Sequence, residues 1–216
     1  MRELSNFHRW GWEIVPAVFT TNEMNLLSEE CDLLMEDRTM LATRGAVKGS
    51  PPRNDRLDPV SDISAVFRST VSDRRLINLA ESAVSGQVER LKDKLIFKPP
   101  GSTGYALHQD FAYWQSFGYT PDEMVTLAVC IDDMTLQNGA IEFALGCTWT
   151  LETPMGEICD PDPERFSQFR AAEATAGDVV IFSSLVPHRS FANKSSFSRR
   201  VLFASYVRSK RFADAS

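Results

Sequence analysis

The stretch that decides the fold is GDVVIFSSLVPHRSFANKSSFSRRVLFASYV, which covers residues 177–207. It holds two apolar runs, 179–182 and 201–207, rich in the β-branched and aromatic residues that favour strands. The turn signal Gly177-Asp178 precedes the first run. His188 follows that run, and Arg199 stands where the second run begins. This order predicts two core strands with polar side chains placed near their ends.

The same pattern continues towards the N-terminus. Short β-like runs occupy 95–97, 105–108, 125–131 and 140–145, and the turn signal Asn138-Gly139 separates the last two. Ahead of them, apolar residues recur at helical spacing over 20–38 and again from Ser72 or Asp73 to about Leu91. Helices followed by short strands predict a mainly β fold with α, in which a β-sandwich or open barrel carries a helical layer.

The domain layout follows from these elements. At 216 residues one domain is expected, with a helical layer at about 20–92 and a β-barrel core at about 95–207. Residues 41–64 are rich in Gly and Pro and carry Arg44, Lys48, Arg53 and Arg56, which predicts a long, lid-like loop. Residues 149–176 predict an insertion between strands, with a helix over 164–174.

Composition limits the classes of function. The net charge of −6 and pI of about 5.2 oppose binding to nucleic acid and to anionic membranes. The four cysteines form no C-x-x-C pair, which favours free thiols in a reducing cytoplasm. The N-terminus lacks a signal-peptide core, and no apolar run is long enough to span a bilayer. We therefore expect a soluble, cytoplasmic protein.

One pair of residues suggests a metal. His108 and Asp110 stand two residues apart, and in an extended strand this spacing places both side chains on one face. With His188 they would offer two imidazoles and one carboxylate, the set that leaves positions on an iron open for a cosubstrate and O2. Taken alone the pattern is weak, because a histidine beside a strand is more often a hydrogen-bonded structural residue.

Arg199 suggests an anion. A guanidinium buried at the start of the strand 201–207 needs an anionic partner, and its planar fork suits a carboxylate. Ser190 could add a hydroxyl donor to the same carboxylate. In isolation, the basic pair Arg199-Arg200 favours a surface charge at a strand end.

Together these residues resemble the phytanoyl-CoA dioxygenase-like family of Fe(II)/2-oxoglutarate-dependent oxygenases. The resemblance covers most of the chain, begins faintly at 10–15, and is most specific in the spacing from His188 to Arg199. It rests on His108-Gln109-Asp110 with Tyr113, on Asn138-Gly139-Ala140, on Gly177-Asp178, and on His188, Ser190, Asn193 and Arg199.

The resemblance implies a double-stranded β-helix, a jelly-roll or cupin-like barrel, with Fe(II) at its open end. By that likeness the catalytic metal ligands are His108, Asp110 and His188. Arg199 and Ser190 would bind the distal carboxylate of 2-oxoglutarate, and Thr126 is a plausible further contact. The expected reaction uses O2, converts 2-oxoglutarate to succinate and CO2, and hydroxylates an unactivated C–H bond.

Several alternatives remain open. A jelly-roll metal-binding protein or isomerase could use the same ligands, and an oxygenase of this class could instead catalyse desaturation, cyclisation or epimerisation. We expect a small-molecule substrate of specialised metabolism, with no nucleic acid or membrane as partner. The candidate substrate contacts, which could equally be core or surface residues, are Tyr113, Trp114, Arg53 and Arg56.

Overall fold

The computed structural model describes residues 3–48, 53–146 and 149–212. Its strands are β1 (Trp12–Val15), β2 (Gly45–Lys48), β3 (Arg53–Leu57), β4 (Val88–Lys98), β5 (Tyr105–His108), β6 (Met124–Cys130), β7 (Ile141–Ala144), β8 (Phe169–Ala171), β9 (Val179–Ser183), β10 (His188–Ser190) and β11 (Arg199–Arg208). Its α-helices are α1 (Ser5–Trp10), α2 (Thr21–Glu36), α3 (Arg38–Arg44), α4 (Ala65–Val71), α5 (Arg74–Val84) and α6 (Phe111–Trp114).

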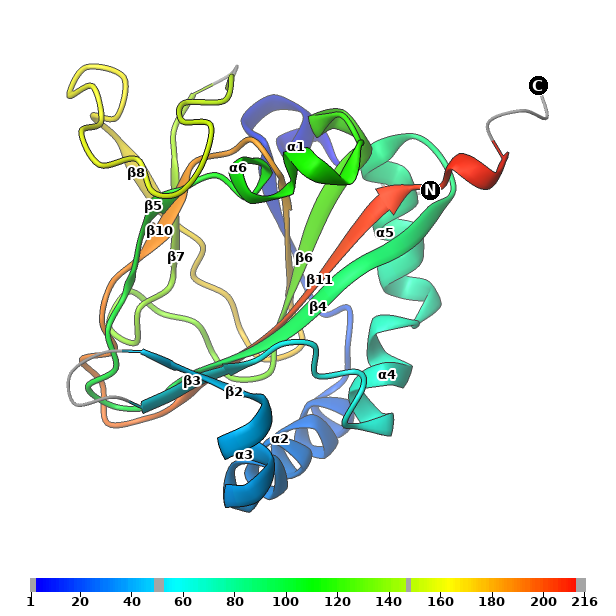
Figure 1. The fold of residues 1–216 in the computed structure, drawn as a ribbon, viewed down its shortest axis with the longest axis vertical. Helices are drawn as coiled ribbons and strands as arrows, with labels where there is room; N and C mark the ends of the chain where they lie inside the picture. The colour runs from blue at the N-terminus through cyan, green and yellow to red at the C-terminus, as the bar shows by residue number, and fades with distance from the viewer. Residues whose placement is uncertain (1–2, 49–52, 147–148, 213–216) are drawn as a thin grey trace.

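The strands form two antiparallel sheets, seen on the left and in the centre of Figure 1. The larger sheet has the order β1-β9-β6-β11-β4-β3-β2, and the smaller has the order β5-β10-β7-β8. From β5 onwards the chain passes repeatedly from one sheet to the other, with β7 and β8 as two successive strands of the smaller sheet, so residues far apart in the sequence pair with one another. This is the jelly-roll arrangement of a double-stranded β-helix, and it confirms the predicted fold class.

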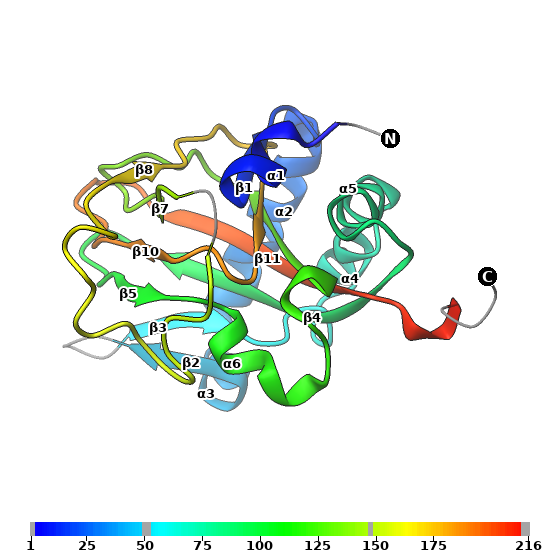
Figure 2. The same ribbon diagram turned by 90° about the horizontal axis from the view of Figure 1, so that it is seen from above.

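Helices cover the outer face of the larger sheet (Figure 2). Leu27 of α2, Phe67 of α4 and Leu76 of α5 are buried in one apolar cluster with Leu127 of β6 and Leu202 of β11. The N-terminus of α2 is fixed by a capping box between Thr20 and Glu23, as the sequence predicts. The helical layer therefore supports the sheet from behind and leaves its inner face to the site.

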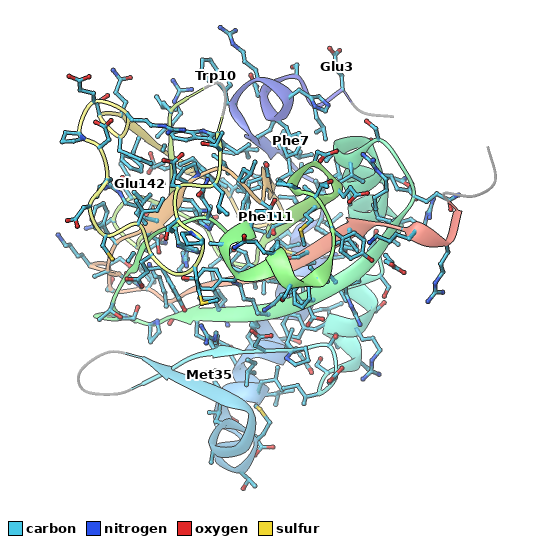
Figure 3. The ribbon with its side chains drawn as sticks, turned by 45° about the horizontal axis from the view of Figure 1, so that its top comes forward. Glu3, Phe7, Trp10, Met35, Phe111 and Glu142 are labelled. Atoms are coloured by element: carbon cyan, nitrogen blue, oxygen red, sulfur yellow. The ribbon has the colours of Figure 1, made fainter. Side chains whose placement is uncertain are left out.

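The inner faces of the two sheets share a second apolar cluster. Trp12 of β1 stacks on Phe143 of β7 with 4.7 Å between ring centroids, and Phe182 of β9 packs against the same ring. In Figure 1, α6 lies near the top of the view between the sheets, and Figure 3 marks it by Phe111. This end of the barrel carries the polar residues predicted to bind a metal.

The prediction of a long loop at 41–64 is wrong, because described parts of this segment form a helix and two strands. Residues 38–44 form α3, and β2 and β3 form a hairpin that extends the larger sheet through pairs such as Arg56 with Ile96 of β4. An edge strand has one unpaired side and tolerates the polar, glycine-rich composition that suggested a loop. The side chains of Arg44, Lys48 and Arg53 lie outside the described residues.

Two predicted helices also differ from the structure. The second helix ends at Val84, before Ser85 in the left-handed region with φ 53°, and its predicted continuation to Leu91 lies in β4. Val88 and Leu91 match a helical repeat, but here they pair with β11 or flank a bulge. The predicted helix at 164–174 is wrong, because Phe169–Ala171 forms β8 and pairs with β7.

The remaining expectations concern cysteines and membranes. Cys31 and Cys130 are buried, Cys159 is exposed, and all three are free thiols. Cys147 lies outside the described residues. Within the described ranges, no helix combines the length and apolar character needed to cross a bilayer.

Candidate metal centre

Two neighbouring strands of the smaller sheet bring the histidines together. His108 ends β5, His188 begins β10, and the two residues pair directly across the antiparallel ladder. Residues opposite each other in such a ladder project to the same face, and the two rings lie 4.3 Å apart between centroids. The Nδ1 atoms lie 2.8 Å and 3.0 Å from the carbonyl oxygens of Ala106 and Val186. This contact fixes the ring orientation and leaves Nε2 as the atom that can bind a metal.

Asp110 is the third member of the cluster, but its backbone is not in the extended conformation that the sequence argument assumed. Its backbone is helical, with φ −59° and ψ −37°, because the chain turns from β5 into α6 directly after His108. The extended-strand argument for His108 and Asp110 is therefore wrong, although its outcome holds. One potential ligand atom from each of His108, Asp110 and His188 lies within 4.8 Å of the others.

Hydrogen bonds and charges prepare these side chains for a cation. Burial lowers the pKa of His188 to about 3 and also lowers the pKa of His108, so both rings are neutral near pH 7 and present a lone pair. Burial raises the pKa of Asp110, but the charges of His188 and Lys94 outweigh it and hold the carboxyl below its usual pKa. The group therefore offers two neutral nitrogens and one carboxylate, the donor set that suits non-haem iron.

Thr126 lies beside the metal ligands. Its hydroxyl donates to Oδ2 of Asp110 at 3.2 Å and lies 3.0 Å from Oγ of Ser205 on β11. The predicted contact of Thr126 with the cosubstrate stays a prediction, and in this structure its hydrogen bond orients the carboxylate of Asp110. Such bonds hold a ligand in position before the metal arrives.

Arg199 is buried at the start of β11, with 1% of its surface exposed. Its Nε atom has no hydrogen-bond partner among the described residues, and Nη1 contacts only the sulfur of Met134 at 3.5 Å. Burial without an acidic partner lowers the pKa of the guanidinium to about 10. Arg200 next to it points to the outer face and bonds to Asp132 and Asp32, so the surface-charge interpretation fits neither residue.

Lys98 is a site residue that sequence reasoning missed. It pairs with Arg199 across β4 and β11 and is likewise 1% exposed. Its Nζ donates to Oγ of Ser190 at 2.9 Å, to the carbonyl of Gly139 at 3.4 Å and to the carbonyl of Phe191. Ser190, predicted to act with Arg199, thus bonds to the lysine that is the strand partner of Arg199.

Two of the quoted motifs explain how this buried region is built. Gly139 has φ 81°, and a Cβ atom there would lie 2.8 Å from Nζ of Lys98 and would clash with the carbonyl of Phe191. The Asn193 amide donates to the carbonyls of Lys98 and Phe197, both at 2.7 Å. The Asn-Gly turn and Asn193 therefore fix the backbone around the buried side chain of Lys98.

Three of the four predicted substrate residues line the cavity next to the metal ligands. Tyr113 is 48% exposed, and its ring lies 6.1 Å from that of His108. Trp114 is buried with Met124 and Val207, although it also borders the cavity next to the metal ligands. Arg56 lines that cavity, whereas the side chain of Arg53 lies outside the described residues. The cavity thus includes His108, Asp110, Tyr113, Trp114 and Arg56.

The phytanoyl-CoA dioxygenase (PhyH) family model matches residues 7–201. The chain therefore belongs to the PhyH family. A curated relative, 2-aminoethylphosphonate dioxygenase of the uncultured bacterium HF130_AEPn_1, is 32% identical over 156 residues, which are 71% of this chain and 58% of that protein. The match thus spans less than two thirds of that relative.

Solved structures share the same fold. EctD from S. alaskensis with 2-oxoglutarate and 5-hydroxyectoine superposes with a TM-score of 0.81 at 22% identity, covering 94% of this chain and 74% of that one. The α-ketoglutarate-dependent epimerase SnoN from nogalamycin biosynthesis gives a TM-score of 0.80 at 20% identity, over 94% of this chain and 81% of SnoN. One of these structures contains 5-hydroxyectoine and the other protein is an epimerase, so the same fold serves more than one reaction.

Proposed function

We propose that this protein is an Fe(II)/2-oxoglutarate-dependent dioxygenase that hydroxylates a C–H bond of a small molecule. His108, Asp110 and His188 would bind the iron, and Arg199, Ser190 and Lys98 would bind the distal carboxylate of 2-oxoglutarate. Family membership supports the class of enzyme. The relative named for 2-aminoethylphosphonate supports a small substrate, and the EctD structure with a hydroxylated product supports hydroxylation.

One observation carries the proposal. Arg199 is almost fully buried, its Nε is unbonded among the described residues, and the neighbouring cation Lys98 is buried beside it. Burying a cation without a counter-anion is costly, so proteins retain such an arrangement where a ligand supplies the anion. A dicarboxylate with a second chelating end would link this pocket to the three metal ligands.

Different residues of the site would orient the metal ligands, bind the cosubstrate and exclude water. The backbone carbonyls of Ala106 and Val186 orient the two imidazoles, and Thr126 orients the Asp110 carboxylate. Lys98 donates a hydrogen bond to the hydroxyl of Ser190. Arg199 would bind the distal carboxylate of 2-oxoglutarate through its planar guanidinium group. Iron with bound 2-oxoglutarate supplies the oxidising power for C–H hydroxylation. The apolar faces of Phe143 and Phe182 beside His188 exclude water from the inner side of the centre.

The test needs no substrate. Metal-free protein is titrated anaerobically with Fe(II) and then with 2-oxoglutarate, and the weak visible charge-transfer band of the chelated keto acid is recorded. We expect the wild-type protein to give the band, His108→Ala to lose it and Arg199→Ala to require far more 2-oxoglutarate. Succinate release then provides the screen for substrates.

A matched control is available on the same chain. His8 is exposed on α1 and distant in sequence from the cluster, so His8→Ala should keep both iron binding and the band. Tight iron binding without a band in the wild-type protein would contradict the proposal. It would favour a jelly-roll metal-binding protein or isomerase instead.

A further inference from the structure

The metal ligands open into a cavity of about 430 Å³ with two chemically different walls. Strands β3 and β4 of the larger sheet contribute Arg56, Lys92 and Lys94, together with Asp58 just after β3. The other wall carries Tyr113 and the exposed Glu157, whose backbone bridges to His108. The cations are therefore concentrated on one side of the metal centre.

Lys94 lies on the inner face of β4, between Lys92 and Lys98 in the alternating pattern. Among the described residues its ammonium makes no hydrogen bond or ion pair, and its one recorded contact is with the ring of Phe203, 5.3 Å from the centroid. Burial lowers the pKa of Lys94, and the charge of Asp110 is the largest influence that raises this pKa. A metal would neutralise Asp110 and leave Lys94 without an anion.

Arg56 reaches the same wall from β3, where its backbone pairs with Ile96 of β4. Its Nε atom is buried and has no hydrogen-bond partner among the described residues. Lys92 differs, because it lies 3.4 Å from the carboxylate of Asp58. Of the three cations on this wall, Lys92 is thus paired while Arg56 and Lys94 are available to a ligand.

We propose that the substrate carries an oxyanion group, which Arg56 and Lys94 bind at the mouth of the metal cavity. This inference rests on the proposed dioxygenase function and adds the chemical class of the substrate. A phosphonate or a carboxylate has the required chemistry, since a guanidinium binds either through paired N–H donors and an ammonium acts as a point charge. Docked there, the anion would direct the carbon chain of a small substrate across the cavity towards the iron.

Glu157 sets the polarity of the bound molecule. It lies on the wall opposite Arg56 and Lys94, next to Tyr113. Burial raises the pKa of the Tyr113 hydroxyl, and the charge of Glu157 raises it further. Of the other carboxylates that line the cavity, Asp58 lies 3.4 Å from the ammonium of Lys92, and Asp110 would be bound by the metal. A substrate in the reverse orientation would bring its anion against Glu157.

The test follows probe binding to the anaerobic Fe(II)–2-oxoglutarate complex through the change in the visible band. The probes are propylphosphonate, butanoate and 1-butanol, so that the arms separate a phosphonate, a carboxylate and a neutral group of similar size. We expect one or both anions to perturb the band and the alcohol to leave it unchanged. The anion that binds more tightly identifies the source of the oxyanion.

Variants assign the effect to residues. Arg56→Gln and Lys94→Met should each weaken binding of the anionic probe by about tenfold or more, as expected for loss of a charge-assisted contact in a partly enclosed site. The matched control is the double variant Lys92→Met/Asp58→Asn, which removes both partners of an ion pair whose side chains are each 33% exposed. It leaves the net charge of the wall unchanged and should weaken binding by no more than about twofold.

The possible failures are distinguishable. Absence of the band itself in the wild-type protein would contradict the dioxygenase function. A normal band that no anion perturbs would overturn the oxyanion inference alone. Weaker 2-oxoglutarate binding in Arg56→Gln or Lys94→Met, with probe binding unchanged, would also overturn it by assigning these cations to the cosubstrate.

Discussion

The two faces of the seven-stranded sheet differ in how they hold polar side chains. On the outer face, Asp93 accepts hydrogen bonds from the backbone of Val60 and Ser61, and the Tyr206 hydroxyl donates to the carbonyl of Val71 at 2.6 Å. On the inner face, Lys94 and Arg199 lie in partly or fully buried positions without an acidic partner among the described residues.

This difference separates stability from function within one sheet. Polar groups that are bonded inside the protein stabilise it, whereas buried cations without an anion destabilise it until a ligand binds. The polar groups of the outer face are bonded and stabilise the protein, whereas Lys94 and Arg199 on the inner face have no acidic partner among the described residues and are available to a ligand. Substitutions on each face test this difference.

The adjacent pair Arg199 and Arg200 should give the largest contrast. In the proposed site, replacing Arg199 by Met would remove a buried charge-assisted contact to the 2-oxoglutarate carboxylate. The expected loss of about 3 kcal/mol or more corresponds to at least about 100-fold weaker binding. The same change removes an unpaired buried charge, so the unfolding free energy without cosubstrate should stay equal or rise. Anaerobic titration of the visible band and urea unfolding measure the two quantities.

Arg200→Met is the matched control on the outer face. Its guanidinium bonds to Asp132 at 2.7 Å and to Ser28 and Asp32 of α2, so its loss should lower the unfolding free energy by about 1–3 kcal/mol. Cosubstrate binding should be unchanged in the folded protein. If both variants lost stability equally and bound 2-oxoglutarate equally, the proposed division between the two faces would be wrong.

Lys98 allows the comparison to be made within the inner face. It lies opposite Arg199 but is bonded to the buried carbonyl of Gly139 and the partly buried carbonyl of Phe191. Lys98→Met removes the donor of both and should lower the unfolding free energy by about 1–3 kcal/mol. Loss of its bond to Ser190 should also weaken 2-oxoglutarate binding by about 30-fold, for a charged hydrogen bond of about 2 kcal/mol.

The same two measurements test this prediction. Lys92→Met is the control, since its side chain is paired with Asp58 at the rim and should change neither quantity appreciably. A Lys98→Met protein that lost stability but bound 2-oxoglutarate normally would make Lys98 a structural residue alone.

The features predicted well from the sequence are those whose chemistry is local. The strand ending at His108, the apolar run before His188 and the capping box at Thr20 all have a periodicity or spacing that physical rules can interpret. The metal cluster follows from them because two of its members close or open a strand. Their pairing across β5 and β10 then needs only the jelly-roll order.

What the sequence left hidden depends on register. A lysine in a strand usually lies on a solvated face, so Lys94 and Lys98 give no signal until β4 is known to pair with β11 and to point them inward. The same register places the side chain of Arg199 on the inner face, where it is buried without an acidic partner among the described residues. It places the side chain of Arg200 on the outer face, where it bonds to Asp32 of α2. The alternation Lys92, Lys94, Ile96, Lys98 is a period-two pattern, but its polar face resembles that of an ordinary exposed strand.

The hairpin at 45–57 was hidden for a related reason. Among its side chains that the structure describes, Leu57 belongs to the apolar core, and Arg56 and Leu57 pair with β4. Composition therefore indicated a loop, although Arg56 is delivered to the cavity by a strand. A side chain on a paired strand is held in place better than one on a free loop, which strengthens its role as a ligand contact.

Thr126 gives the smallest predicted effect and the finest test of the inner face. Thr126→Val removes the 3.2 Å bond to Asp110 while nearly preserving shape, and loss of such a ligand-orienting bond should weaken Fe(II) binding by about tenfold. Ser205→Ala is the control, because it removes the 3.0 Å contact between the two hydroxyls and leaves the bond to Asp110 in place. Anaerobic competition with a metallochromic chelator measures both. Equal iron affinity in the two variants would mean that His108 and His188 fix the metal without help from the Asp110 orientation. A loss confined to Thr126→Val would show that this inner-face hydroxyl stabilises the metal centre rather than the sheet.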